Sequence, residues 1–238
     1  SAGCGSGGGP PFTDRATEAH RVEKIEALRK KSQDQPRDAR VWQELGSELL
    51  RKSGSLVHLN DLAIGQDEMI LWPKAERVLD EAIHAIENAL LLDSTDARLF
   101  ALAGHAYFAK FRSDPVVNDA VRVVKAISLL ERSIRLDPRF VDAHIDLGLA
   151  LTPSWRCEGD IKLARAHLEK ALSLSPDDGM AYYVLAGVLE VEERYPEALS
   201  ALRKALSLGL RDEVAYLDLP ARYQRMCWRM YEGDDQET

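Results

Sequence analysis

Apolar and small residues recur at helical spacing through most of this chain, and their order repeats. The copy that begins at Gly179 places them at Tyr182, Leu185, Ala186, Leu189, Ala198, Leu202, Ala205 and Leu210. The copy that begins at Val141 places them at His144, Leu147, Gly148, Leu151, Ala164, Leu168, Ala171 and Pro176, with extra residues between its two halves. A fixed register over about 34 positions predicts a repeated pair of helices.

Two further copies lie upstream in the same register. One is formed by Trp42, Leu45, Gly46, Leu49, Ala82, Ile86, Ala89 and Ser94, and the other by Phe100, Ala103, Gly104, Tyr107, Ala126, Leu130, Ser133 and Pro138. Glycine or alanine recurs at positions 46, 104, 148 and 186, where it would let the two helices of a pair approach closely. Because a single pair cannot bury its apolar face alone, the pairs should stack on one another.

The stretch Trp42-Gln43-Glu44-Leu45-Gly46 resembles the W-x-x-L-G signature of the tetratricopeptide repeat family. The later alanines and prolines also fall where that family has them, and the resemblance covers about residues 39–212. The sequence departs from the family pattern at His144, Ala103 and Ala186. The resemblance implies an all-α, right-handed α-solenoid of about four irregular hairpins with terminal capping helices. The expected units are a half-repeat at 13–36, repeats at 39–96, 97–140, 141–178 and 179–212, and a capping helix at 213–231.

The expected hairpins carry inserts. Ser53-Gly54-Ser55 is predicted to break the first helix, and residues 53–72 are too apolar for a simple solvated loop. This insert should fold back onto the solenoid or meet a partner. Pro73 should open the next helix, Pro196 should open the second helix of the last repeat, and Asp160 should cap the second helix of the third repeat.

Both ends of the chain differ from the repeats. Residues 1–12 are rich in glycine and proline and are expected to be a flexible tail, and residues 233–238 form an acidic tail. Small residues before Cys4, followed by a Gly/Ser tract, resemble the end of a bacterial lipoprotein signal, although Ser1 stands where leucine is usual. The resemblance implies a lipid on Cys4 and a place on the periplasmic side of a membrane. The alternatives are a plain disordered tail and a cytoplasmic protein.

Charge and cysteine content limit the classes of function that the chain can have. The 238 residues carry a net charge of −8, which argues against a general nucleic-acid surface, because phosphate binding needs clustered Lys and Arg. No apolar run approaches the roughly 20 residues that span a bilayer. The three cysteines lack metal-ligand spacing, and Cys227 is predicted to be buried in an apolar-aromatic run.

No catalytic constellation or cofactor-binding motif is evident. Glu81 and His84 have the spacing of a di-iron carboxylate site, but no second E-x-x-H motif exists, so an exposed helix face is the simpler interpretation. His144 is expected to be a packed core residue, and His167 to have no partner at ligand spacing. The chain is therefore predicted to be non-enzymatic and to need no cofactor.

The resemblance implies a concave groove lined by positions 2, 5, 9 and 12 of each first helix. The candidate partner-binding residues at these positions are Arg40, Gln43, Arg98, His105, Phe108, Ile145, Leu149, Met180 and Tyr183. The groove should be basic at its N-terminal end and apolar in its middle. Because the apolar members do not occupy the stacking positions, they should need a cover: a partner, a ligand or the 53–72 insert.

The predicted function is a protein–protein interaction scaffold, adaptor or assembly factor that binds a peptide or an amphipathic helix in the groove. The alternative is a periplasmic lipoprotein that binds an apolar small molecule or serves as an accessory component of a transport or secretion system.

Overall fold

The computed structural model describes residues 15–62, 68–112, 120–152, 158–210, 222–224 and 226–228. Within these ranges all regular secondary structure is helical. The helices are α1 (Arg15–Asp34), α2 (Ala39–Leu62), α3 (Glu68–Leu92), α4 (Ala97–Arg112), α5 (Ala120–Leu136), α6 (Val141–Leu151), α7 (Glu158–Leu174), α8 (Gly179–Val191) and α9 (Tyr195–Leu208). The two short pieces near the C-terminus are also helical. None of the described helices is long and apolar enough to cross a membrane.

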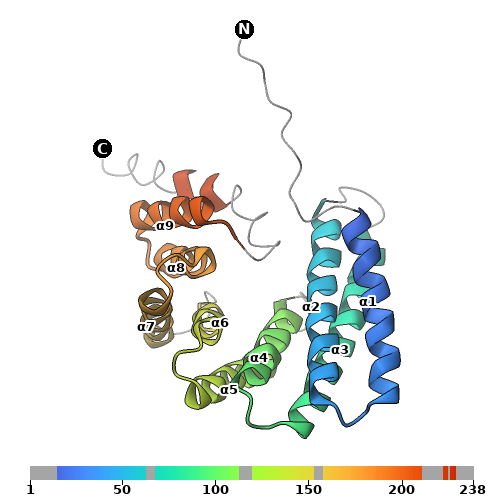
Figure 1. Ribbon diagram of the computed structural model, residues 1–238. Coiled ribbons are helices and arrows are strands. Elements are labelled where there is room, and N and C mark those ends of the chain that lie inside the picture. The colour runs from blue at the N-terminus through green and yellow to red at the C-terminus, as the bar shows by residue number, and fades with distance from the viewer. Residues whose placement is uncertain are drawn as a thin grey trace, which may run out of the picture.

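Neighbouring helices pair into four stacked hairpins. The pairs are α2 with α3, α4 with α5, α6 with α7 and α8 with α9, and the second helix of each pair contacts the first helix of the next. The first helices also contact each other in sequence, from α2 through α4 and α6 to α8. The hairpins follow a crescent, with α4, α6 and α8 on its inner side and α5 and α7 on its outer side (Figure 1). The all-α solenoid predicted from the sequence is confirmed.

Glycines set the spacing within the first three hairpins. A Cβ atom added to Gly46, Gly104 or Gly148 would lie 2.5–2.8 Å from a side-chain atom of Ile86, Leu130 or Leu168, respectively. Each contacted residue is the large apolar residue that the repeat register places in the second helix. The small residues therefore let the two helices approach within direct packing distance, as the pattern predicts.

The turns before the first helices share one hydrogen-bond pattern. The backbone N–H groups of Gln35, Asp93, Asp137 and Ser175 each donate to the carbonyl four residues earlier. Asp38, Asp96 and Asp178 then accept a backbone N–H at the start of α2, α4 and α8, at 2.9 Å in each case. Such bonds satisfy N–H groups that a helix leaves without partners at its start. α6 differs, because its N-cap residue Phe140 provides no side-chain cap.

Helix α1 covers the exposed side of the first hairpin. Its Ile25 and Leu28 are buried in one cluster with Leu45 and Leu49 of α2. Polar contacts between side chains flank this apolar contact. Nζ of Lys24 lies 2.9 Å from Oε1 of Glu48, and Arg29 donates two hydrogen bonds of 2.6 Å to the carboxylate of Glu81. The apolar stripe predicted for the N-terminal helix therefore packs against the solenoid.

The described residues of the insert, 53–62 and 68–72, extend two helices, so the predicted break at Ser53-Gly54-Ser55 is wrong. Helix α2 continues to Leu62, and α3 already begins at Glu68, which places Pro73 inside α3 and not in its first turn. A glycine inside a helix costs only about 1 kcal/mol, which the favourable continuation of a long amphipathic helix offsets. Ser53 also donates to the carbonyl of Leu50, a bond that is compatible with continued helix.

Two smaller predictions are also corrected. Helix α7 begins at Glu158, so Asp160 lies in its first turn and is not its N-cap residue. Cys227 is exposed, because the adjacent Met226 faces the core and one step along a helix turns the side-chain direction by about 100°. Pro196 does lie at the start of α9, as predicted. The tails at 1–12 and 233–238, including Cys4, lie outside the described residues.

Candidate functional site

The nine candidate groove residues lie on the first helices α2, α4, α6 and α8, which form the inner side of the crescent (Figure 1). They differ in how far solvent reaches them. Arg40 and Arg98 are exposed. Gln43, His105, Leu149 and Met180 are partly buried, and Phe108, Ile145 and Tyr183 are buried. The accessible part of the candidate set is therefore mainly its polar N-terminal end.

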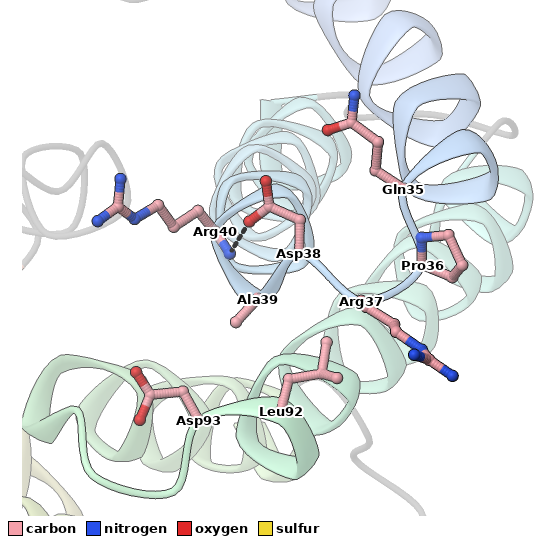
Figure 2. A pocket seen from close by; sticks show the side chains of 8 residues that line it. All are labelled: Gln35, Pro36, Arg37, Asp38, Ala39, Arg40, Leu92 and Asp93. Atoms are coloured by element: carbon pink, nitrogen blue, oxygen red, sulfur yellow. Dashed lines mark hydrogen bonds between the residues drawn. The ribbon is translucent and has the colours of Figure 1, made fainter.

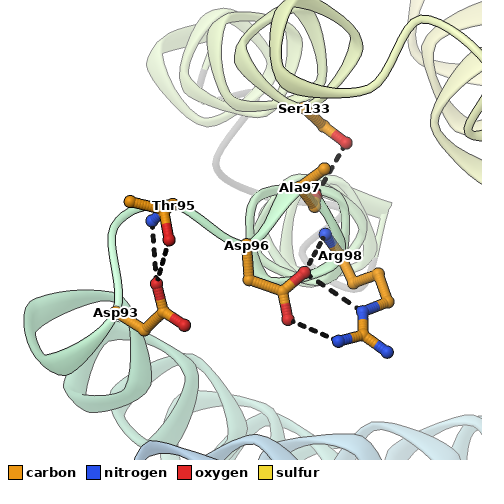
Figure 3. A network of polar contacts seen from close by, with 6 residues as sticks. All are labelled: Asp93, Thr95, Asp96, Ala97, Arg98 and Ser133. Carbon is orange, nitrogen blue, oxygen red and sulfur yellow. Dashed lines mark hydrogen bonds and ion pairs between the residues drawn. The ribbon is translucent and has the colours of Figure 1, made fainter.

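Arg98 is held at the start of α4 by the carboxylate that caps this helix. Its Nη2 and Nε atoms lie 2.9 and 3.1 Å from the two oxygens of Asp96, which also accepts the Arg98 backbone N–H (Figure 3). The hydrogen bond from the Arg98 side chain lowers the pKa of Asp96, against the opposing effect of burial. The Arg98 side chain still keeps 69% of its surface exposed, so it can contact a partner.

Arg40 occupies the equivalent position at the start of α2. Its backbone N–H donates to Asp38 at 2.9 Å, while its side chain extends away from the helix (Figure 2). It lines an open pocket formed by the α1–α2 turn and the end of α3. Arg37, on the same turn, points in a different direction, so the two guanidinium groups do not converge on one ligand (Figure 2).

His105 connects two repeats within the groove. Its Nδ1 lies 3.2 Å from Oδ1 of Asp146, which belongs to α6. The His105 side chain is 40% exposed and that of Asp146 is 20% exposed. Asp146 cannot be predicted from the repeat register, because it does not occupy one of the four positions expected to face the groove. Only the contact between α4 and α6 brings it beside His105.

The apolar residues of the candidate set are largely part of the core, which corrects the expectation that stacking does not bury them. Phe108 and Ile145 retain only 6% and 4% of their surface and belong to the same buried cluster as the hairpin core. The reason is that successive first helices contact each other, so side chains on their facing edges bury one another. Leu149 and Met180 pack against the same cluster.

Tyr183 is covered by a residue from the C-terminal part of the chain. The guanidinium carbon of Arg222 lies 4.9 Å from the centroid of the Tyr183 ring. Arg222 also donates from Nε to Oε2 of Glu190 at 2.8 Å. The sequence suggested a partner, a ligand or the 53–72 insert as the cover, and Arg222 is none of these. The contact joins residues 39 positions apart in the chain.

His144 is buried, as predicted, but it has a histidine neighbour that the sequence analysis missed. Its Nε2 lies 3.1 Å from the carbonyl oxygen of Pro138, and its Nδ1 lies 3.0 Å from Nδ1 of His167. The first contact requires a proton on Nε2, so Nδ1 accepts a hydrogen bond from His167. Burial, and then the neighbouring His144, lower the pKa of His167.

The Glu81 and His84 pair is engaged in other contacts. Arg29 binds both carboxylate oxygens of Glu81, and the ring of His84 packs edge-on against Trp42 with centroids 6.4 Å apart. Among the residues that the structure describes, no group of three or more His, Cys, Asp and Glu side chains is placed to hold a metal ion.

Comparison with known proteins agrees with this architecture. Residues 158–212 match the family described as tetratricopeptide repeat. The crystal structure of TTC0263, a thermophilic TPR protein in Thermus thermophilus, superposes with a TM-score of 0.63 and 19% identity, covering 90% of this chain and 93% of that one. The crystal structure of MamA gives a TM-score of 0.53 and 21% identity, covering 84% and 94%. The comparison with curated proteins gives no match.

Proposed function

Because residues 158–212 match the tetratricopeptide repeat family and the chain folds like solved tetratricopeptide repeat proteins, we propose that it is a non-catalytic scaffold that binds a protein partner along the inner side of its solenoid. The partner segment would be a peptide or an amphipathic helix, because these are the forms that fit an extended groove between helices.

The observation that carries the proposal is the row of accessible polar side chains on successive first helices. Arg40 and Gln43 on α2, Arg98 and His105 on α4, and Asp146 on α6 retain exposed surface on helices that contact each other in order. Rigid helices hold these groups in fixed positions before a partner arrives, which reduces the entropy lost on binding. The N-terminal half of the groove is therefore the proposed contact surface.

A polypeptide partner is better supported than an apolar small molecule. The apolar residues that would line a small-molecule site, Phe108, Ile145 and Tyr183, are already packed within the protein. A small apolar ligand would have to separate these side chains before it gained contacts with them. A polypeptide can instead use the polar groups of the N-terminal half without opening the core.

Site-specific crosslinking tests the proposal. A photoreactive amino acid at Gln43 should crosslink a partner in an extract of the native cells, whereas the same group at Lys170, an exposed position on the outer helix α7, should not. The charge reversals Arg40→Glu and Arg98→Glu should together reduce the Gln43 crosslink at least fivefold. Lys170→Glu with Lys204→Glu is the charge-matched control, because these exposed residues lie on the second helices α7 and α9 and not on the first helices that carry the proposed surface. Crosslinks of equal yield at both positions would reject the groove as the binding surface.

Attachment to a membrane through Cys4 is a separate proposal, carried by the sequence alone. The full gene product, expressed in bacteria, should sediment with membranes, and Cys4→Ser should release it, because several acyl chains on one residue bind a bilayer stably. Wild-type protein that stays in the soluble fraction would contradict the lipid anchor. Deleting residues 1–12 should leave the thermal midpoint unchanged in either case.

A further inference from the structure

The contacts of Arg222 define a small site on the last hairpin. Tyr183, Gly187 and Glu190 stand at positions i, i+4 and i+7 of α8, so they share one face of this helix. The Glu190 carboxylate accepts the Nε–H of Arg222 at 2.8 Å, and the Tyr183 ring lies beneath the guanidinium. The Tyr183 carbonyl oxygen lies 3.5 Å from Nη1.

Gly187 supplies the space for the guanidinium. A Cβ atom at this position would lie 2.4 Å from Nη2 of Arg222, so the guanidinium would have to move from its present position to make room for it. Together these groups present an acceptor, an aromatic face and a gap, a combination that suits the planar guanidinium of arginine better than the compact ammonium of lysine. The Arg222 side chain retains only 12% of its surface in this site.

The three residues that form the site also occupy groove positions in the repeat register. They are positions 5, 9 and 12 of the last first helix, where the repeat pattern places contacts to a partner. The chain thus fills the partner-facing positions of its own last hairpin with a side chain of its C-terminal segment. One helical turn after Arg222, Met226 is fully buried in the main core cluster and anchors the same segment.

We propose that the inner face of α8 is an arginine-binding site, occupied in the free protein by Arg222, and that a helical partner segment replaces it with an arginine of its own. The partner carries this arginine one turn before a large apolar residue, as Arg222 stands before Met226. The inference deepens the proposed scaffold function and rests on it, because it names the chemistry of one partner contact.

A peptide in trans tests the site in the full chain. The probe is a fluorescent peptide of residues 213–231 with Cys227→Ser, and its anisotropy reports binding. The peptide should bind the Arg222→Ala chain at least tenfold more tightly than the wild-type chain, in which the site is occupied. The same peptide with Arg222→Ala should bind the Arg222→Ala chain at least tenfold more weakly. The original peptide should also bind at least tenfold more weakly to a chain that carries both Arg222→Ala and Gly187→Ala. Equal binding to wild type and Arg222→Ala, or equal binding of the arginine-free peptide, would overturn the proposal.

Chemical rescue gives a second measurement that does not depend on the peptide. The thermal midpoint of the Arg222→Ala chain should rise in millimolar ethylguanidinium, which can occupy the vacated site, and should not rise in ethylammonium at the same concentration. The double variant with Gly187→Ala should respond to neither. An identical response to both cations would overturn guanidinium recognition. If both measurements fail while the Gln43 crosslink persists, this inference is wrong and the scaffold function stands.

Discussion

Leu168 packs directly against Gly148, and a Cβ atom at Gly148 would lie 2.8 Å from its Cγ. This contact joins α6 to α7 within the third hairpin. The equivalent pairs in the first two hairpins, Gly46 with Ile86 and Gly104 with Leu130, are equally close. The distance between paired helices is therefore set by the absence of a side chain on one of them.

Gly148→Leu should destabilise the protein by about 1–3 kcal/mol or more, because overpacking a close helix contact forces side chains and backbone to move. Gly54→Ala is the matched control. It lies within α2, and a Cβ atom there would meet nothing within 4 Å, so the gain in helix propensity should stabilise the protein by roughly 0.5–1 kcal/mol. Urea denaturation measures both. Equal effects of the two substitutions would contradict the packing role of Gly148.

Asp178→Ala should cost about 1 kcal/mol, because the Asp178 carboxylate accepts the N–H groups of Met180 and Ala181 at the start of α8. The neighbouring Asp177→Ala removes the same charge from an exposed side chain and serves as the control. Its effect should stay within about 0.5 kcal/mol. A comparable loss in both variants, measured by thermal melts, would assign the effect to charge and not to the cap.

His167 should make the fold less stable in mild acid. Its pKa is lowered in the folded chain, mainly by burial, whereas the unfolded chain binds a proton near the ordinary value of about 6.5. Stability is therefore fully present above that value and falls as the pH drops towards the lower folded pKa, because the unfolded state then binds more protons.

His167→Gln isolates this contribution, because glutamine can still donate a hydrogen bond to Nδ1 of His144 but does not titrate. The difference in unfolding free energy between wild type and variant should shift in favour of the variant as the pH falls from 7.5 to 5. A difference that is independent of pH, in urea titrations at both values, would show that His167 does not resist protonation in the folded protein.

Tyr183→Ala combined with Leu149→Ala should destabilise the fold and not merely weaken partner binding. Tyr183 is 8% exposed and Leu149 packs against the main core cluster, and replacing a buried aromatic residue by alanine typically costs about 3–5 kcal/mol. Leu91→Ala, at a side chain that is 84% exposed, should change stability by no more than about 0.5 kcal/mol. An unchanged urea midpoint in the double variant would show that Tyr183 and Leu149 do not stabilise the fold, and they would again be candidates for partner contacts.

The helices and their register could be predicted from the order of residues alone. The close contacts of Gly46, Gly104 and Gly148 with the second helices and the proline at the start of α9 follow from local spacing. These features are predictable because helix periodicity, N–H satisfaction and the small volume of glycine act over a few residues or one hairpin. Local rules fail at Ser53-Gly54-Ser55, because the helix penalty of a single glycine is too small to end a long amphipathic helix.

The accessibility of the groove residues, in contrast, depends on tertiary packing. Burial of Phe108 and Ile145 depends on how closely successive first helices pack, and the pair formed by His105 and Asp146 depends on the same contact. The cover of Tyr183 by Arg222 joins residues 39 positions apart, and the contact between His144 and His167 joins two separate helices. No periodic pattern encodes such contacts, because they follow from the curvature of the whole stack and from where the C-terminal segment returns to it.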